Sequence, residues 1–234
     1  MSGSLRREIS VLQREPYELI ETTMPSIGDP KIFRKAVSHL SRNDPRLGGV
    51  IEEHGIMSFS PSGDMFDSLV ESIIGQQLAR PAADAIIARV RSIYGEKDLD
   101  PALIYKTPTS RLRRAGVSPQ KIRYLKDLSS RVVHGKLDLE SLRREPDNVV
   151  LEALDQVLGI GPWTVHMILI FTLGRPNVLP VDDLGMKKAI QSIYSLRELP
   201  KKEKIVRLAE PWHPYCSVAS LYLWRHKDGL RDQR

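Results

Sequence analysis

The feature that most constrains the fold is a glycine-rich turn between two segments with helical spacing. The turn has the sequence LGIGPWT at positions 158–164. Apolar residues recur at helical intervals before it, from Val150 to Leu158, and after it, from Val165 to Thr172. Asp147 is available as the N-cap of the first helix, and Pro162 suits the first position of the second. We therefore predict a helix, a tight hairpin and a second helix.

The two glycines of this hairpin indicate a backbone that approaches another surface closely. Gly159 and Gly161 bracket Ile160, and their missing side chains permit a sharp turn. Backbone amides here and at the next helix start, including that of Thr164, are expected to point outward and to suit a phosphate oxygen. An ordinary turn between helices is the alternative. The tryptophan and threonine after the turn, and an acidic pair further on, favour a binding site.

Helical spacing dominates the rest of the chain as well. The clearest stripe runs from Phe66 to Ile74 at i, i+3, i+4, i+7 and i+8. Residues 1 to about 30 predict a loosely ordered start or one short helix, and residues 178–181 predict a loop. We predict an all-α protein of about ten helices. Helices are expected around residues 30–55 with a break at 43–45, and at 66–75, 81–95, 109–115, 118–128, 150–158, 162–172, 183–193 and 218–224.

Composition excludes several classes of protein. Lys and Arg outnumber Asp and Glu by 35 to 29, and the net charge of +6 permits a polyanionic partner without proving one. The single Cys216 excludes an internal disulfide framework and a four-cysteine metal centre. Residues 1–10 lack the apolar core of a signal peptide, and the longest apolar run, residues 167–173, is too short to span a membrane. We expect an intracellular protein that does not bind membranes.

The sequence predicts no metal ion and no cofactor. The histidines lack the spacing of a zinc centre, and Asp182-Asp183 has no acidic neighbours that would complete a two-metal site. The histidines considered for this are His134, His166, His213 and His226.

With these residues in view, the chain resembles the helix-hairpin-helix DNA glycosylases, and among them the 3-methyladenine DNA glycosylase II branch. Three segments carry the resemblance: residues 66–95 with the turn IGQQ at 74–77, residues 154–189, and residues 211–224. The resemblance implies two helical lobes with the hairpin and an acid in the cleft between them. One lobe is expected to comprise residues 1–65 with 180–234, and the other residues 66–179, including a helix-hairpin-helix at about 147–173.

The resemblance also implies a reaction. Members that cut the DNA strand carry a lysine where this chain has Trp163, and an indole cannot form a Schiff base. The chain is therefore expected to excise alkylated purines of the 3-methyladenine or 7-methylguanine type from double-stranded DNA, without lyase activity. We expect it to act as a monomer. A non-catalytic DNA-binding protein and a glycosylase for another damaged base are the alternatives.

The catalytic acid implied by the resemblance is one of two neighbouring aspartates. Asp183 matches the family register, in which a variable residue, a small residue and an aliphatic residue follow the acid, whereas counting from Pro180 favours Asp182. A carboxylate near the sugar would stabilise the positive charge that develops as the base departs. Helix capping is the alternative role for each. We prefer Asp183 and keep Asp182 as the alternative.

The resemblance places further residues at the pocket and the DNA. Trp163 and Trp224 match pocket positions, where aromatic faces attract a cationic alkylated base, although core packing is the alternative for each. Met167 and Leu184 would complete the lining; a bacterial relative has tyrosine at both positions, so this pocket is expected to be less aromatic and a broad substrate range is in doubt.

The resemblance also assigns residues that would hold the DNA. The turn with Gln76 and Gln77 corresponds to the wedge that fills the gap left by the flipped base, and Gln77 is the preferred candidate. A glutamine-rich helix end is the alternative. In relatives the hairpin carbonyls also hold a monovalent cation, which the sequence leaves open here. The residues expected to bind the DNA backbone are Gly159, Ile160, Gly161 and Thr164.

Overall fold

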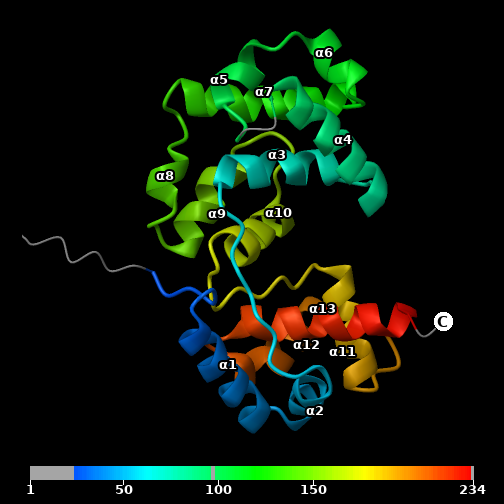
Figure 1. Cartoon of the computed structure of the whole chain (residues 1–234). Helices are drawn as coiled ribbons and strands as arrows, with labels where there is room; N and C mark the ends of the chain where they lie inside the picture. The colour runs from blue at the N-terminus through cyan, green and yellow to red at the C-terminus, as the bar shows by residue number, and fades with distance from the viewer. Residues whose placement is uncertain (1–23, 96–97, 233–234) are drawn as a thin grey trace, which may run out of the picture.

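The computed structural model describes residues 24–95 and 98–232, and all the regular secondary structure of these residues is helical (Figure 1). The predicted start of the chain falls mostly on residues 1–23, which lie outside the described residues. The α-helices are α1 (Pro30–Asn43), α2 (Pro45–His54), α3 (Met65–Gly75), α4 (Arg80–Ile93), α5 (Pro101–Lys106), α6 (Thr109–Arg114), α7 (Pro119–Val133), α8 (Leu139–Leu142), α9 (Asp147–Asp155), α10 (Pro162–Met167), α11 (Leu184–Ile193), α12 (Lys202–Ala209) and α13 (Cys216–Asp232). A π-helix η1 (Ile168–Thr172) and a 3-10 helix η2 (Glu210–Trp212) complete them.

The all-α prediction is confirmed for the described residues, but the expected number of helices was too low. Thirteen α-helices occupy residues 24–95 and 98–232. Helices α5 and α8 have six and four residues, too few for an apolar pattern to repeat. Within the same residues, no helix combines the length and the apolar character needed to cross a membrane.

Local sequence signals explain where many of these helices begin. Aspartate caps α1, α2, α3, α5, α8 and α11, and Ser118 caps α7, with each side chain accepting from a backbone amide of the first turn. Proline follows the cap in α1, α2, α5 and α7. The predicted cap at Asp147 was wrong. This residue is the first of α9, and its carboxylate lies 3.4 Å from Nε of the buried Arg175 instead.

The buried apolar residues form two clusters, and each belongs to one group of helices. The first cluster runs from Met65 to Val178, within α3 to α10 and η1, which we call the hairpin lobe. The second joins residues 27–51 to residues 186–223, from α1, α2, α11, α12, η2 and α13, which we call the terminal lobe. Figure 1 shows the two groups one above the other, with the chain passing between them after α2 and again before α11.

Helix α13 links the two clusters. Leu221 packs against both, and Trp224 packs against the first although its helix belongs to the terminal lobe. Side chains in the middle of α13 therefore meet those of the hairpin lobe.

Candidate active site

An acidic side chain lies where the two lobes meet. Asp183 caps α11, and its Oδ1 accepts a hydrogen bond of 2.7 Å from the backbone amide of Met186. The indole Nε1 of Trp163, from α10, donates to Oδ2 at 2.9 Å, and that of Trp224, from α13, donates to Oδ1 at 2.8 Å. One carboxylate thus receives hydrogen bonds from both lobes.

The partners of Asp183 are suited to a carboxylate and hold it in position. All three groups are N–H donors, and a carboxylate accepts whereas a carboxylic acid must also donate. The side chain is buried, and Trp163 beside it is 45% exposed. The arrangement suits a fixed negative charge at the edge of an open surface.

The neighbouring Asp182 has a different environment. Its carboxylate lies 2.8 Å from Nζ of Lys202 and 3.9 Å from Nζ of Lys187. The hydrogen bond from Lys202 lowers the pKa of Asp182 below its ordinary value, and the charge of Lys187 adds to this effect. Asp182 therefore forms a surface ion-pair cluster, while Asp183 joins the two tryptophans.

Both predicted pocket tryptophans hydrogen-bond to the acid: Trp163 is exposed, and Trp224 is partly buried against the core of the hairpin lobe. The third tryptophan, Trp212, is fully buried in the terminal lobe. Trp224 stacks on Phe171, with ring centroids 5.4 Å apart and planes inclined by 27°. Leu184 is exposed beside Asp183 at the start of α11.

Phe171 is an aromatic residue at this site that the sequence analysis missed. It lies in η1, is exposed, and contacts Phe59 as well as Trp224. The signal was available, because Trp163, Met167 and Phe171 follow one another at intervals of four residues. Phe171 adds a ring beside Trp224 to the residues named from the sequence, and the expectation of a less aromatic pocket at Met167 and Leu184 stays a prediction.

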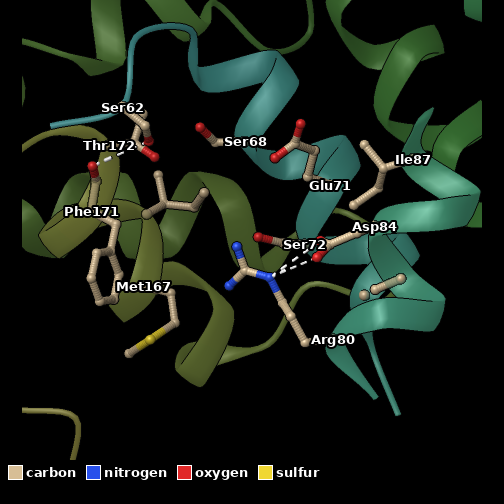
Figure 2. A pocket seen from close by; sticks show the side chains of 13 residues that line it. Ser62, Ser68, Glu71, Ser72, Arg80, Asp84, Ile87, Met167, Phe171 and Thr172 are labelled. Carbon is tan, nitrogen blue, oxygen red and sulfur yellow. Dashed lines mark hydrogen bonds and ion pairs between the residues drawn. The ribbon is translucent and has the colours of Figure 1, made fainter. Parts of the chain in front are cut away.

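Met167 faces a cavity of about 340 Å³ between α3, α4 and η1. Figure 2 shows Met167 and Phe171 on one wall of the cavity, with Glu71, Arg80 and Asp84 opposite. The residues around Asp183 do not line it. Phe171 thus lines this cavity and also stacks on Trp224, whereas the predicted pocket grouped Met167 with Trp163 and Leu184.

The hairpin has the predicted tight turn, and its two glycines differ in whether the fold would accept a side chain. Gly159 has a φ of 81°, and a Cβ there would lie 2.2 Å from Cδ2 of Tyr124. A Cβ on Gly161 would meet nothing within 4 Å. Gly159 is therefore required by the fold, while Gly161 leaves open space at the start of α10.

The hairpin amides divide into occupied and free donors. The amide of Ile160 donates to the carbonyl of Val157 at 3.1 Å, so this residue is not the free donor that was expected. Among the described residues, the amides of Gly159, Gly161 and Thr164 have no hydrogen-bond acceptor. Thr164 is buried as a whole residue, and it lines a pocket of about 350 Å³ together with Gly159 and Gly161.

The glutamine turn after α3 is attached directly to the hairpin. Nε2 of Gln76 donates to the carbonyl of Gly159 at 2.7 Å, and Nζ of Lys121 donates to the carbonyls of Ile74 and Gln76. Burial lowers the pKa of Lys121. Gln77 is exposed at the tip, with a φ of 58° that is rare for a residue other than glycine.

Comparison with known proteins agrees with this geometry. Residues 70–214 match the family described as HhH-GPD superfamily base excision DNA repair protein. DNA-3-methyladenine glycosylase 1 of Schizosaccharomyces pombe is 31% identical over 198 residues, which cover 82% of this chain and 86% of the relative.

Two solved structures are similar in both sequence and fold. A DNA-3-methyladenine glycosidase from Bacillus halodurans has a TM-score of 0.77 and 34% identity, covering 89% of this chain and 94% of that one. The S. pombe 3-methyladenine DNA glycosylase in complex with abasic DNA has a TM-score of 0.75, 31% identity, and coverage of 82% and 95%. The chain belongs to the HhH-GPD superfamily of base-excision DNA repair proteins.

Proposed function

We propose that this chain is a monofunctional DNA glycosylase that flips alkylated purines out of double-stranded DNA and hydrolyses their N-glycosidic bond. The observation that carries the proposal is the carboxylate of Asp183, which receives hydrogen bonds from Trp163, Trp224 and the amide of Met186. The names of the relatives, which are 3-methyladenine DNA glycosylases, support the same substrate class.

The role of Asp183 follows from the charge that develops in the reaction. As the base leaves C1′, positive charge spreads over the sugar ring, and a fixed carboxylate stabilises it. The three donors hold Asp183 in one position, so it need not reorganise when that charge appears. Water then attacks C1′, and the carboxylate orients it. The products are a free base and an abasic site.

The aromatic residues at the acid support recognition of a cationic base. Alkylation of a purine ring nitrogen gives the base a positive charge, which the face of an aromatic ring attracts. Trp163 is exposed beside the acid, and Trp224 and Phe171 form a stacked pair next to it. A cationic base leaves without prior protonation, so no second acid is required.

The hairpin and the glutamine turn are suited to hold distorted DNA. Free amides at Gly159, Gly161 and Thr164 are suitable donors to phosphate oxygens, and Gly161 permits close approach. Gln77 is the proposed wedge that enters the gap left by the flipped base, and its exposure in a turn linked to the hairpin through Gln76 supports this role.

Trp163 occupies the position at which strand-cutting relatives carry a lysine, which supports an enzyme without lyase activity. An indole nitrogen is not a nucleophile toward an aldehyde. Borohydride treatment during the reaction is therefore expected to give no covalent protein–DNA adduct, and a strong adduct would contradict this part of the proposal.

The direct test is chromatography of the bases released from methylated duplex DNA. The proposal predicts release of free 3-methyladenine or 7-methylguanine in an enzyme-dependent manner. Binding to the same DNA without release of any base would instead identify a non-catalytic DNA-binding protein. Release of only oxidised or deaminated bases from a second panel would reassign the substrate.

A further inference from the structure

A second group of chemically reactive side chains lies in the terminal lobe, apart from the residues that contact Asp183. Glu53 and His54 end α2, and His226 lies in α13. Each offers one ligand atom, and the three atoms lie within 4.8 Å of one another. Sequence spacing does not link His226 to His54, because the two are remote in the chain and the fold alone brings them together.

Both histidines have a buried ring nitrogen without a partner among the described residues. Nε2 of His54 and Nε2 of His226 are inaccessible to solvent and take part in no hydrogen bond. Buried polar atoms are almost always satisfied, and leaving one unpaired is unfavourable. A neutral imidazole nitrogen can be satisfied by a hydrogen-bond donor or by a metal ion.

The backbone that carries these side chains is held in place by its own contacts. The Tyr222 hydroxyl, one turn before His226, donates to the carbonyl of Gly55 at 2.9 Å, directly after His54. A Cβ on Gly229 would lie at ordinary contact distance from the His54 ring, 3.9 Å from Cε1. The end of α2 and α13 are thus held side by side where the three ligand atoms gather.

The electrostatic setting also favours a cation. His54 is the last residue of α2, where the helix dipole places partial negative charge. The Glu53 carboxylate lies 3.9 Å from Nδ1 of His226 and is exposed, so it can move toward the ring nitrogens. Ligand atoms of a tetrahedral zinc ion are about 3.3 Å apart, which follows from bond lengths of about 2.0–2.1 Å.

We propose that Glu53, His54 and His226 form a binding site for a divalent transition-metal ion of the zinc class. Two imidazoles and one carboxylate supply three ligands, and water completes a tetrahedral set. Nitrogen ligands favour zinc, copper, nickel or cobalt over magnesium and calcium. The ion joins α2 to α13, the helix that also carries Trp224, and its effect is to stabilise this pair of helices.

The test uses the full chain, treated with a chelator, dialysed, and titrated with zinc chloride by calorimetry. The proposal predicts one ion per chain with a dissociation constant in the micromolar range or below. Thermal unfolding with zinc in excess is expected to show a rise in Tm of several degrees, because the ion binds the folded state. Binding weaker than about 100 µM, or a stoichiometry other than one ion per chain, would overturn the proposal.

Substitution of each proposed ligand in turn tests whether the ion binds at these three residues. His226→Gln and His54→Gln should each weaken zinc binding by about 100-fold, and the exposed Glu53→Gln by about tenfold, as expected for loss of one ligand. The matched control is His134→Gln, an exposed histidine at the end of α7 in the hairpin lobe, which should bind zinc as the wild type does. Circular dichroism checks that each variant folds. Should the histidine variants fail to fold, Glu53→Gln decides, and wild-type affinity in that variant would refute the site.

Discussion

At the scale of single residues, Trp224 contacts both lobes, because it hydrogen-bonds to Asp183 of its own lobe and stacks on Phe171 of the hairpin lobe. The indole donates to Oδ1, and its ring stacks on Phe171. Two functions therefore converge on one side chain, namely positioning of the carboxylate and contribution to an aromatic surface.

Trp224→Phe separates these two functions, because phenylalanine keeps a ring for Phe171 and removes the donor to Asp183. Loss of a hydrogen bond to a charged group predicts a fall of about 10- to 100-fold in the rate of base release. Single-turnover excision measures it. The matched control is Phe171→Leu, which leaves the hydrogen bonds of Asp183 intact and should lower the rate by less than about tenfold. An unchanged rate in Trp224→Phe would show that this hydrogen bond has no role in the reaction.

We predict opposite effects on stability when each of the two hairpin glycines is replaced by alanine. Gly159→Ala places a Cβ against Tyr124 at a positive φ, so we expect a loss of stability of about 2 kcal/mol or more. Gly161→Ala meets no atom and has an ordinary φ of −113°, so its Tm should match the wild type.

DNA affinity provides the second measurement on this pair. The methyl group of Gly161→Ala would stand where the backbone is expected to approach phosphate, so binding to a duplex with an abasic-site analogue should weaken several-fold, as measured by fluorescence anisotropy. Wild-type affinity in this variant would argue against hairpin contact with DNA.

At the scale of elements, local signals predicted helices far better than they predicted the contacts of those helices. Three predictions were correct: the cap at Ser118, the break before Pro45 and the start of α11 at Asp183. Such signals are reliable because capping depends on a few adjacent residues. The π-helix after α10 was not predictable from spacing. Its apolar residues fit an α-helical pattern equally well, and the wider turn is set by tertiary packing.

Asp44 caps α2 and also accepts hydrogen bonds from residues outside that helix. It accepts from the amides of Arg46 and Leu47 in α2, and also from the Tyr194 hydroxyl and from Nε1 of Trp212 at 2.7 Å. Burial, followed by the bond to Asp44, raises the pKa of Tyr194 far above its ordinary range. This carboxylate therefore ties the start of α2 to the residues after α11 and in η2.

Asp44→Ala should accordingly lower the free energy of unfolding by about 3 kcal/mol, because it leaves buried donors without an acceptor. Asp29→Ala removes an exposed cap of α1 only, and about 1 kcal/mol is expected. Urea denaturation of the two variants compares them directly. Equal losses would mean that the bonds from Tyr194 and Trp212 contribute nothing beyond capping.

At the scale of the whole molecule, the sequence predicted the kinds of residues at the site but could not show which of them meet. Trp163, Asp183 and Trp224 were each singled out, and their shared hydrogen bonds depend on the approach of α10, α11 and α13. His54 beside His226 went unnoticed for the same reason, whereas Phe171 was indicated by its four-residue spacing from Met167. Long-range packing decides such contacts, and it leaves no periodic trace in the sequence.

The central claim is that the carboxylate at the junction of the lobes, Asp183, drives base release, and that its neighbour Asp182 does not. Single-turnover release of 7-methylguanine from a defined duplex, measured for Asp183→Asn and Asp182→Asn side by side, tests it most directly. Asp183→Asn should be slower by about 100- to 1,000-fold with DNA binding retained, the scale for loss of one preorganised charge. Asp182→Asn should stay within a few-fold of wild type, since it loses surface ion pairs only. Full activity in Asp183→Asn, or loss confined to Asp182→Asn, would contradict the account.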